Sequence, residues 1–317
     1  MKRFSLLIMV ATMMLAAVSC GKDDTTSADN NNNTNSANDG VYNPAKKIAE
    51  CSYWDKWDES WILEESWNWE NNKLKSIDHM SYYGEVSWSE NYVYQGARII
   101  RVERDDDARY MEFSYTDGRI TKASYYYDGQ LKEEFKFKYS GERLSEIEGT
   151  NYDGYKSSSD EHGWWLLPKH DRNVTDGEPE QVVAKITWQG ENISKISASF
   201  EEEIVEDYYV YTLKSYVEYT MEHDAKNNPK KGFLNIYSFR NDDESLSAFF
   251  NKNNITKGKY YYEAKYYDED GICVYEDTHT EEYEYSYEYD QTGFPIERTT
   301  DLVGEDYEFK EKYEYLK

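Results

Sequence analysis

Hydrophobic and polar residues recur at fixed offsets in five stretches of the chain. In each stretch an aromatic residue is followed five positions later by an aliphatic residue, and three positions after that by a second one or by alanine. The aromatic residues are Trp69, Tyr94, Tyr115, Tyr139 and Trp188, and the first aliphatic residues are Leu74, Ile99, Ile120, Leu144 and Ile193. Glycine or asparagine lies between the two, as expected where a strand reverses in a tight turn with a positive-φ residue. The pattern therefore predicts a series of β-hairpins.

Within these hairpins, aromatic and charged residues alternate with a period of two. Phe135, Phe137 and Tyr139 share one face, whereas Lys136 and Lys138 lie on the other. One covered face and one solvated face are typical of an antiparallel sheet. The aliphatic residues three positions apart break this period, and a β-bulge after each turn would return both to the covered face.

A sheet with this many hairpins has to curl or close in order to cover its aromatic face and remove its edges. We therefore expect an all-β fold, either a curled antiparallel sheet or a closed barrel with tyrosine and tryptophan inside. A membrane-spanning barrel needs an apolar band that faces lipid. Here the non-aromatic face carries Lys, Glu, Asp, Ser and Thr, and the mean hydropathy is −0.98. The expected sheet or barrel is soluble.

Two segments interrupt the hairpin pattern. The insert at residues 149–182 is irregular and concentrates His162, Trp164, Trp165 and His170. Near residues 242–252, an acidic stretch precedes Ser-Leu-Ser-Ala-Phe-Phe, which predicts one short helix with an acidic first turn. We expect this helix to be a plug or flap that packs Leu246, Phe249 and Phe250 against the sheet.

The N-terminus carries a targeting signal. Lys2 and Arg3 precede an apolar run that is shorter than the roughly 20 residues of a membrane span, and small residues precede Cys20. This arrangement resembles a bacterial lipobox, so residues 1–19 are predicted to be a lipoprotein signal peptide and Cys20 the lipidated residue. A plain signal peptide or an uncleaved membrane helix is the alternative.

The residues after Cys20 predict a flexible tether and a cellular location. Gly-Lys-Asp-Asp at 21–24 resembles the acidic export tag of surface lipoproteins in the Bacteroides group, which implies exposure on the outer membrane. Residues 25–40 contain no apolar side chain larger than alanine. The segment 20–44 is therefore predicted to be a disordered tether. Acyl chains on Cys20 would anchor it in outer-membrane lipid, and residues 45–317 would form one domain.

The net charge limits which macromolecules the protein can bind. With 36 basic and 63 acidic residues the net charge is −27, which disfavours nucleic acid and anionic membrane surfaces as binding partners.

Besides Cys20, the cysteines are Cys51 and Cys273. The predicted compartment permits a disulfide between them, and two buried free thiols are the alternative.

Three motifs carry a family resemblance. They are His-Asp-Ala-Lys-Asn-Asn-Pro-Lys-Lys-Gly-Phe at 223–233, Asn-Lys-Asn-Asn-Ile-Thr at 251–256 and Tyr-Glu-Tyr-Asp-Gln-Thr-Gly-Phe-Pro at 287–295. Together they resemble a family of Bacteroides-group surface lipoproteins of unknown function with a porin-like fold, over residues 45–317. The last motif is also similar to tyrosine-aspartate repeats. The resemblance implies a curled sheet or barrel at the cell surface and brings no catalytic residues; the insert does not belong to its pattern.

No motif of a known catalytic or cofactor-binding class occurs in the sequence. We therefore expect a protein that is not an enzyme, with no cofactor and no functional metal. Tryptophans could instead stack on sugar rings. The predicted ligand-binding residues are Trp164, Trp165, His162 and His170 in the insert, and Trp54, Trp57 and Trp61 near the start of the domain. The tryptophans inside the repeats (Trp67, Trp69, Trp88 and Trp188) are expected to line the sheet.

Three functional hypotheses follow. The first is a surface-tethered, non-enzymatic lipoprotein that binds a glycan or a peptide. The second is a structural or accessory subunit of an outer-membrane complex, which would show an apolar patch on its outer face. The third is a hydrolase with an unrecognised pair of carboxylates, which would need both acids at a fixed spacing in one pocket.

Overall fold

The computed structural model describes residues 39–152, 180–206, 209–240 and 243–317, and all that follows concerns these residues. They form sixteen strands and one helix: β1 (Ile48–Asp55), β2 (Ser60–Glu70), β3 (Lys73–Met80), β4 (Val86–Gln95), β5 (Arg98–Arg104), β6 (Tyr110–Thr116), β7 (Arg119–Tyr127), β8 (Gln130–Ser140), β9 (Arg143–Asn151), β10 (Glu180–Gln189), β11 (Asn192–Glu206), β12 (Tyr209–His223), α1 (Asp243–Phe250), β13 (Ile255–Tyr267), β14 (Cys273–Tyr289), β15 (Pro295–Leu302) and β16 (Glu308–Tyr315).

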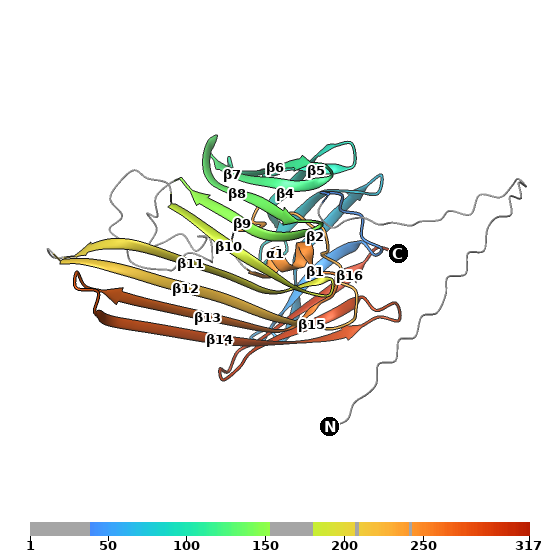
Figure 1. The fold of residues 1–317 in the computed structure, drawn as a ribbon. Coiled ribbons are helices and arrows are strands. Elements are labelled where there is room, and N and C mark those ends of the chain that lie inside the picture. Colours follow the sequence, from blue (N-terminus) through green and yellow to red (C-terminus); the bar gives the residue numbers. More distant parts are fainter. Residues whose placement is uncertain (1–38, 153–179, 207–208, 241–242) are drawn as a thin grey trace, which may run out of the picture. The chain divides into compact units, whose positions relative to one another are not determined.

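The strands form a closed antiparallel barrel (Figure 1). Each strand pairs with its neighbours in chain order, and β1 pairs with β16 to close the sheet. The predicted all-β hairpin fold is therefore confirmed, and the sheet closes completely. No helix in the described residues has the length and apolar character that crossing a membrane requires.

The two ends of the barrel differ. One end, the turn end, holds the short turns of the repeated hairpins, such as residues 71–72 and 141–142. The other, the distal end, holds the connections at 56–59, 81–85, 105–109, 128–129, 268–272 and 303–307. Strands β11 to β14 are 13 to 17 residues long, lie side by side as antiparallel neighbours and extend far toward the distal end (Figure 1).

The repeated offset in the sequence is a β-bulge, as predicted. In the β8–β9 hairpin, Lys138 pairs with Glu146 but Tyr139 pairs with Leu144, so Ser145 is the extra residue. Leu144 and Ile147 consequently both face the interior and are buried. The other four repeats have the same shift, in β2–β3, β4–β5, β6–β7 and β10–β11.

The aromatic residue at each repeat links neighbouring hairpins. The Tyr139 hydroxyl donates a hydrogen bond to the carbonyl of Ile120 in the preceding hairpin at 2.9 Å. Equivalent bonds run from Trp69 to Ile48, from Tyr94 to Leu74, from Tyr115 to Ile99 and from Trp188 to Leu144, at 2.7 to 2.8 Å. A polar tip on a large ring is thus required at this position, because it fills the interior and satisfies a carbonyl at the bulge.

The chain between β12 and β13 folds back into the barrel from the turn end and contains α1 (Figure 1). We call its described residues, 224–240 and 243–254, the plug. Leu246, Phe249 and Phe250 of α1 are buried, as predicted. Plug residues contact several walls, since Phe239 packs on Phe137 of β8 at 4.8 Å while other rings meet β2 and β10. The predicted plug is confirmed.

The interior has an apolar side and an ionisable side. From β5 to β12 the buried wall is mainly aliphatic and aromatic, with Ile99, Val102, Met111, Ile120, Ile147, Ile196 and Val217 among its residues, and its buried Glu133 on β8 pairs with Arg240 of the plug. Around the β1–β16 seam the wall carries Glu65, His79, Glu90, Arg298 and Glu311, of which His79 lies 3.6 Å from Glu90. On the outer wall, Lys136 and Lys138 each pair with Glu148 at 3.2 Å.

The disulfide that the sequence left open does not form, because Cys51 and Cys273 are both free. Cys51 is buried on β1, whereas Cys273 is exposed at the distal start of β14, so the alternative of two buried thiols is also wrong for Cys273. Strands β15 and β16 separate the two strands in the sheet. Closure brings the first and last strands together, but it does not bring Cys51 and Cys273 together.

Candidate functional site

Three of the predicted tryptophans come together at the distal end. Trp54 on β1 pairs across the strands with Trp61 on β2, with ring centroids 5.5 Å apart in an edge-to-face arrangement. Trp57 lies in the connection between these strands and is 86% exposed. The adjacent connection adds Tyr82 and Tyr83, whose rings are 5.7 Å apart. We call these five residues the distal aromatic cluster.

Hydrogen bonds hold the two loops of this cluster in place. The Asp55 carboxylate accepts bonds from the backbone N–H of Trp57 at 2.7 Å and of Asp58 at 3.2 Å. The Tyr82 hydroxyl donates to the Asp58 carboxylate and so joins the two loops. This bond raises the pKa of Tyr82 to about 12, so the hydroxyl stays protonated at neutral pH. The exposed rings are therefore presented by ordered loops.

The sequence interpretation missed Tyr82 and Tyr83, although the run Tyr-Tyr-Gly between two strands was a usable signal. The other predicted ligand-binding residues, Trp164, Trp165, His162 and His170, lie outside the described residues, in the segment that joins β9 to β10.

The tryptophans within the repeats line the interior, as expected. Trp67 is buried and packs on Phe233 of the plug at 4.7 Å, and Trp188 contacts Phe250. The Trp69 indole N–H donates to the carbonyl of Ile48, as described above for the repeats, and the Trp88 ring stacks on the His79 ring with centroids 3.7 Å apart. These rings are structural parts of the barrel.

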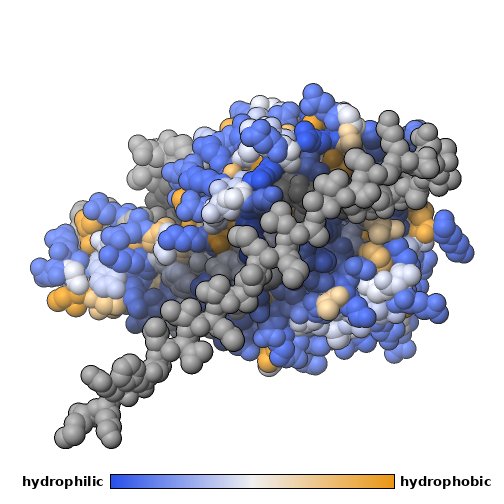
Figure 2. Space-filling view, turned by 45° about the vertical axis from the view of Figure 1, so that its right-hand side comes forward, coloured by the Kyte–Doolittle hydropathy of each residue, from blue (hydrophilic) through white to orange (hydrophobic). Residues whose placement is uncertain are grey.

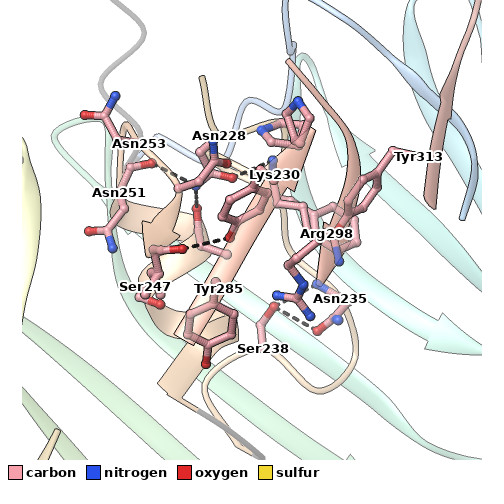
Figure 3. A pocket seen from close by; sticks show the side chains of 17 residues that line it. Asn228, Lys230, Asn235, Ser238, Ser247, Asn251, Asn253, Tyr285, Arg298 and Tyr313 are labelled. Atoms are coloured by element: carbon pink, nitrogen blue, oxygen red, sulfur yellow. Dashed lines mark hydrogen bonds between the residues drawn. The ribbon is translucent and has the colours of Figure 1, made fainter. Parts of the chain in front are cut away.

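A second candidate site lies inside the barrel. A cavity of about 180 Å³ separates the plug from the wall of β14, β15 and β16 (Figure 3). Its cationic side chains are Lys230 of the plug and Arg298 of β15, and the Tyr285 and Tyr313 rings line it too. No Asp or Glu occurs among the described residues that line it.

Most of the asparagines around this cavity brace the plug itself. The Asn228 amide donates to the carbonyls of Ala248 at 2.8 Å and Asn251 at 3.0 Å. Asn251 in turn accepts from the backbone N–H of Ile193 at 2.6 Å. The asparagine-rich motifs that carried the family resemblance thus hold the plug to the barrel, and their amides are already engaged.

Lys230 differs from the asparagines. Its backbone N–H bonds to Asn228, but within the described residues its ammonium makes no side-chain hydrogen bond or ion pair. The ammonium lies 5.9 Å from the centroid of the Tyr313 ring. Burial alone would lower the pKa of Lys230, but the carboxylates of Glu311 and Glu65 outweigh it and raise the pKa, so the group is charged at neutral pH.

The interior carboxylates are engaged with other partners. Glu65 accepts a bond from the Trp67 indole N–H at 2.8 Å, and Glu90 accepts one from the Tyr92 hydroxyl at 3.0 Å. Glu311 forms an ion pair with Arg298. Sequence reasoning missed Lys230, because no local pattern distinguishes it from Lys231 beside it.

Searches of protein-family models and of curated proteins find no match. Among solved structures, a porin-like protein from Bacteroides vulgatus ATCC 8482 is 10% identical, covering 86% of this chain and 99% of that one, with a TM-score of 0.30. A porin-like protein from Bacteroides uniformis ATCC 8492 is 9% identical, covering 85% and 98%, with a TM-score of 0.34. Both neighbours share the porin-like description that the motifs suggested, but at these TM-scores the likeness carries no argument. The barrel assignment therefore rests on the strand pairing of this chain.

Proposed function

We propose that this chain is a surface-tethered, non-enzymatic binding protein that captures a glycan on the distal aromatic cluster. The observation that carries the proposal is the exposure of Trp57 and Tyr83, at 86% and 89%, on loops that hydrogen bonds hold in place. Large exposed rings on ordered loops offer apolar contact area at low entropic cost. Sugar rings present both an apolar face and hydroxyl groups, so they match such rings beside Asp and Glu side chains.

The location follows from the predicted lipid on Cys20. The outer wall carries Lys–Glu pairs such as those of Glu148, and the surface seen in Figure 2 is mostly hydrophilic. Charged groups of this kind are costly on a lipid-facing wall, which favours a barrel outside the bilayer. The described chain starts at the turn end, where the Gly40 carbonyl accepts from the Ile99 N–H at 2.9 Å. The distal aromatic cluster therefore lies at the barrel end opposite to Gly40.

A role as accessory subunit is the second candidate. Exposed hydrophobic and aromatic residues also occur on other distal connections and strand tips, namely Tyr127, Tyr209, Ile272, Val274, Tyr275, Val303 and Tyr307. A partner protein that covered the whole distal end would bury all of them. This spread over several connections is the observation that favours a macromolecular partner.

A glycan array with the full chain, purified in detergent, tests the first proposal. We expect binding by the wild type and a loss of roughly tenfold or more in the Trp57→Ala, Tyr83→Ala double variant, because central aromatic contacts dominate binding energy. Tyr307→Ala is the matched control, since it removes an exposed distal ring outside the cluster.

Equal binding by the double variant would place the site elsewhere on the protein. A wild type that binds no glycan would contradict the capture proposal, and a pull-down from outer membranes would then test the accessory-subunit candidate.

A further inference from the structure

The charged side chains that line the cavity of Figure 3 are opposite in sign to the net charge of the protein. The chain carries a net charge of −27, yet the charged side chains that line this cavity in the described residues are Lys230 and Arg298 alone. The open trough over β11, β12 and β13 is different, because its Lys214 and Lys265 are each paired with a glutamate, at 3.2 and 3.0 Å.

The two cations of the cavity are not equivalent. Arg298 is held by its ion pair with Glu311 and lies over the Tyr285 ring at 5.6 Å. Lys230 forms no ion pair and no side-chain hydrogen bond in the described residues, although its ammonium lies 5.9 Å from the centroid of the Tyr313 ring and the carboxylates of Glu311 and Glu65 stabilise its charge from a greater distance. Partly buried charges are stabilised by pairing, so the Lys230 ammonium is placed to receive an anionic group from outside the chain.

We propose that this cavity binds a small organic carboxylate, whose anionic group pairs with the ammonium of Lys230 beside Arg298. The rest of the lining fits an organic molecule better than a bare inorganic anion, because Phe233, Pro295 and the Tyr313 ring supply apolar surface next to the cation. The cavity volume of about 180 Å³ restricts the ligand to a small molecule.

Calorimetric titration of the full chain in detergent tests this site with benzoate, glucuronate, inorganic phosphate and neutral benzamide. Benzoate and benzamide have similar shapes and differ in charge. We expect the carboxylates to bind more tightly than benzamide and phosphate. Lys230→Met should weaken carboxylate binding by roughly tenfold to a hundredfold, the range for a lost charge-assisted bond.

Two variants serve as controls. Lys230→Arg keeps the positive charge and should retain most of the affinity, and Lys226→Met removes an exposed lysine of the plug and should leave affinity unchanged. If Lys230→Met does not fold, protection of Lys230 from reductive methylation by glucuronate in the wild type, read by mass spectrometry, replaces it.

The proposal is overturned if no carboxylate binds, if benzamide binds as tightly as benzoate, if Lys230→Met binds unchanged, or if glucuronate leaves Lys230 unprotected. Tighter binding of phosphate than of either carboxylate would also overturn it. These outcomes are independent of the glycan array, because neither Trp57 nor Tyr83 lines the cavity.

Discussion

Single residues decide how the plug is held in the barrel, and Arg240 shows this best. Its guanidinium donates two hydrogen bonds to the Glu133 carboxylate on β8, at 2.7 and 2.9 Å. It also lies over the Tyr125 ring at 3.5 Å, and the two charged side chains are only 8% and 9% exposed. Burying such a pair costs desolvation free energy. Removing one partner destabilises the fold further, because the other charge is left buried and uncompensated.

We therefore predict that Arg240→Met lowers the free energy of unfolding by about 3–5 kcal/mol. Denaturation in urea measures this. Lys214→Met is the control, because it breaks the solvent-exposed pair with Glu201 and should cost less than about 1 kcal/mol. Similar small losses for both variants would show that the Arg240–Glu133 pair contributes little to holding the plug.

At the scale of elements, the sequence predicted what is encoded locally. Tyr139 and Leu144 are five residues apart, and this spacing was sufficient to predict the turn, the bulge and the shared interior face. The helix could be predicted in the same way, because its acidic start and its Phe249 and Phe250 are adjacent in the chain. The cavity could not, since Lys230, Arg298 and Tyr313 come from three elements that only barrel closure brings together.

The junction of β12 with the plug makes stability depend on pH. Burial lowers the pKa of His223 to about 4, against the opposing effect of Asp224, while its ordinary value is about 6.5. The neutral imidazole lies 2.9 Å from the Asn251 amide nitrogen. Because the folded pKa is the lower one, this contribution to stability is complete above pH 6.5 or so and is lost as pH falls toward 4.

We expect His223→Gln to lose less stability than the wild type between about pH 6.5 and pH 4, because glutamine does not titrate. Urea unfolding at a series of pH values measures the difference. His279→Gln replaces an exposed histidine of β14 and should leave the wild-type slope unchanged. A wild-type slope in His223→Gln would contradict the assignment.

At the scale of the whole molecule, the barrel depends on the seam where its first and last strands, β1 and β16, pair. Cys51 of β1 lies opposite Tyr313 of β16 at this seam and is 4% exposed. Burial raises the pKa of the Cys51 thiol well above its ordinary value, which further lowers its reactivity. Cys273, in contrast, is exposed.

Thiol labelling can therefore report on closure. With Cys51 as the only cysteine (Cys20→Ala, Cys273→Ser), we predict negligible labelling by a thiol reagent in the folded protein and full labelling in urea. With Cys273 as the only cysteine, labelling should be rapid without denaturant. Rapid labelling of Cys51 under native conditions would mean that the seam opens well below the global unfolding transition.

The chain order of the strands also bears on how the protein is made. A chain that folds from its N-terminal side can add one hairpin at a time, since each strand-end tyrosine or tryptophan finds the carbonyl of the hairpin before it already in place. The edge of β1 that faces away from β2 cannot pair in this way, because its partner β16 (Glu308–Tyr315) is the last of the described strands to be synthesised. A product that ends before residue 308 would carry two unpaired strand edges, which invite association with other chains. Pairing of β16 with β1 thus separates a closed barrel from a chain that is prone to aggregate.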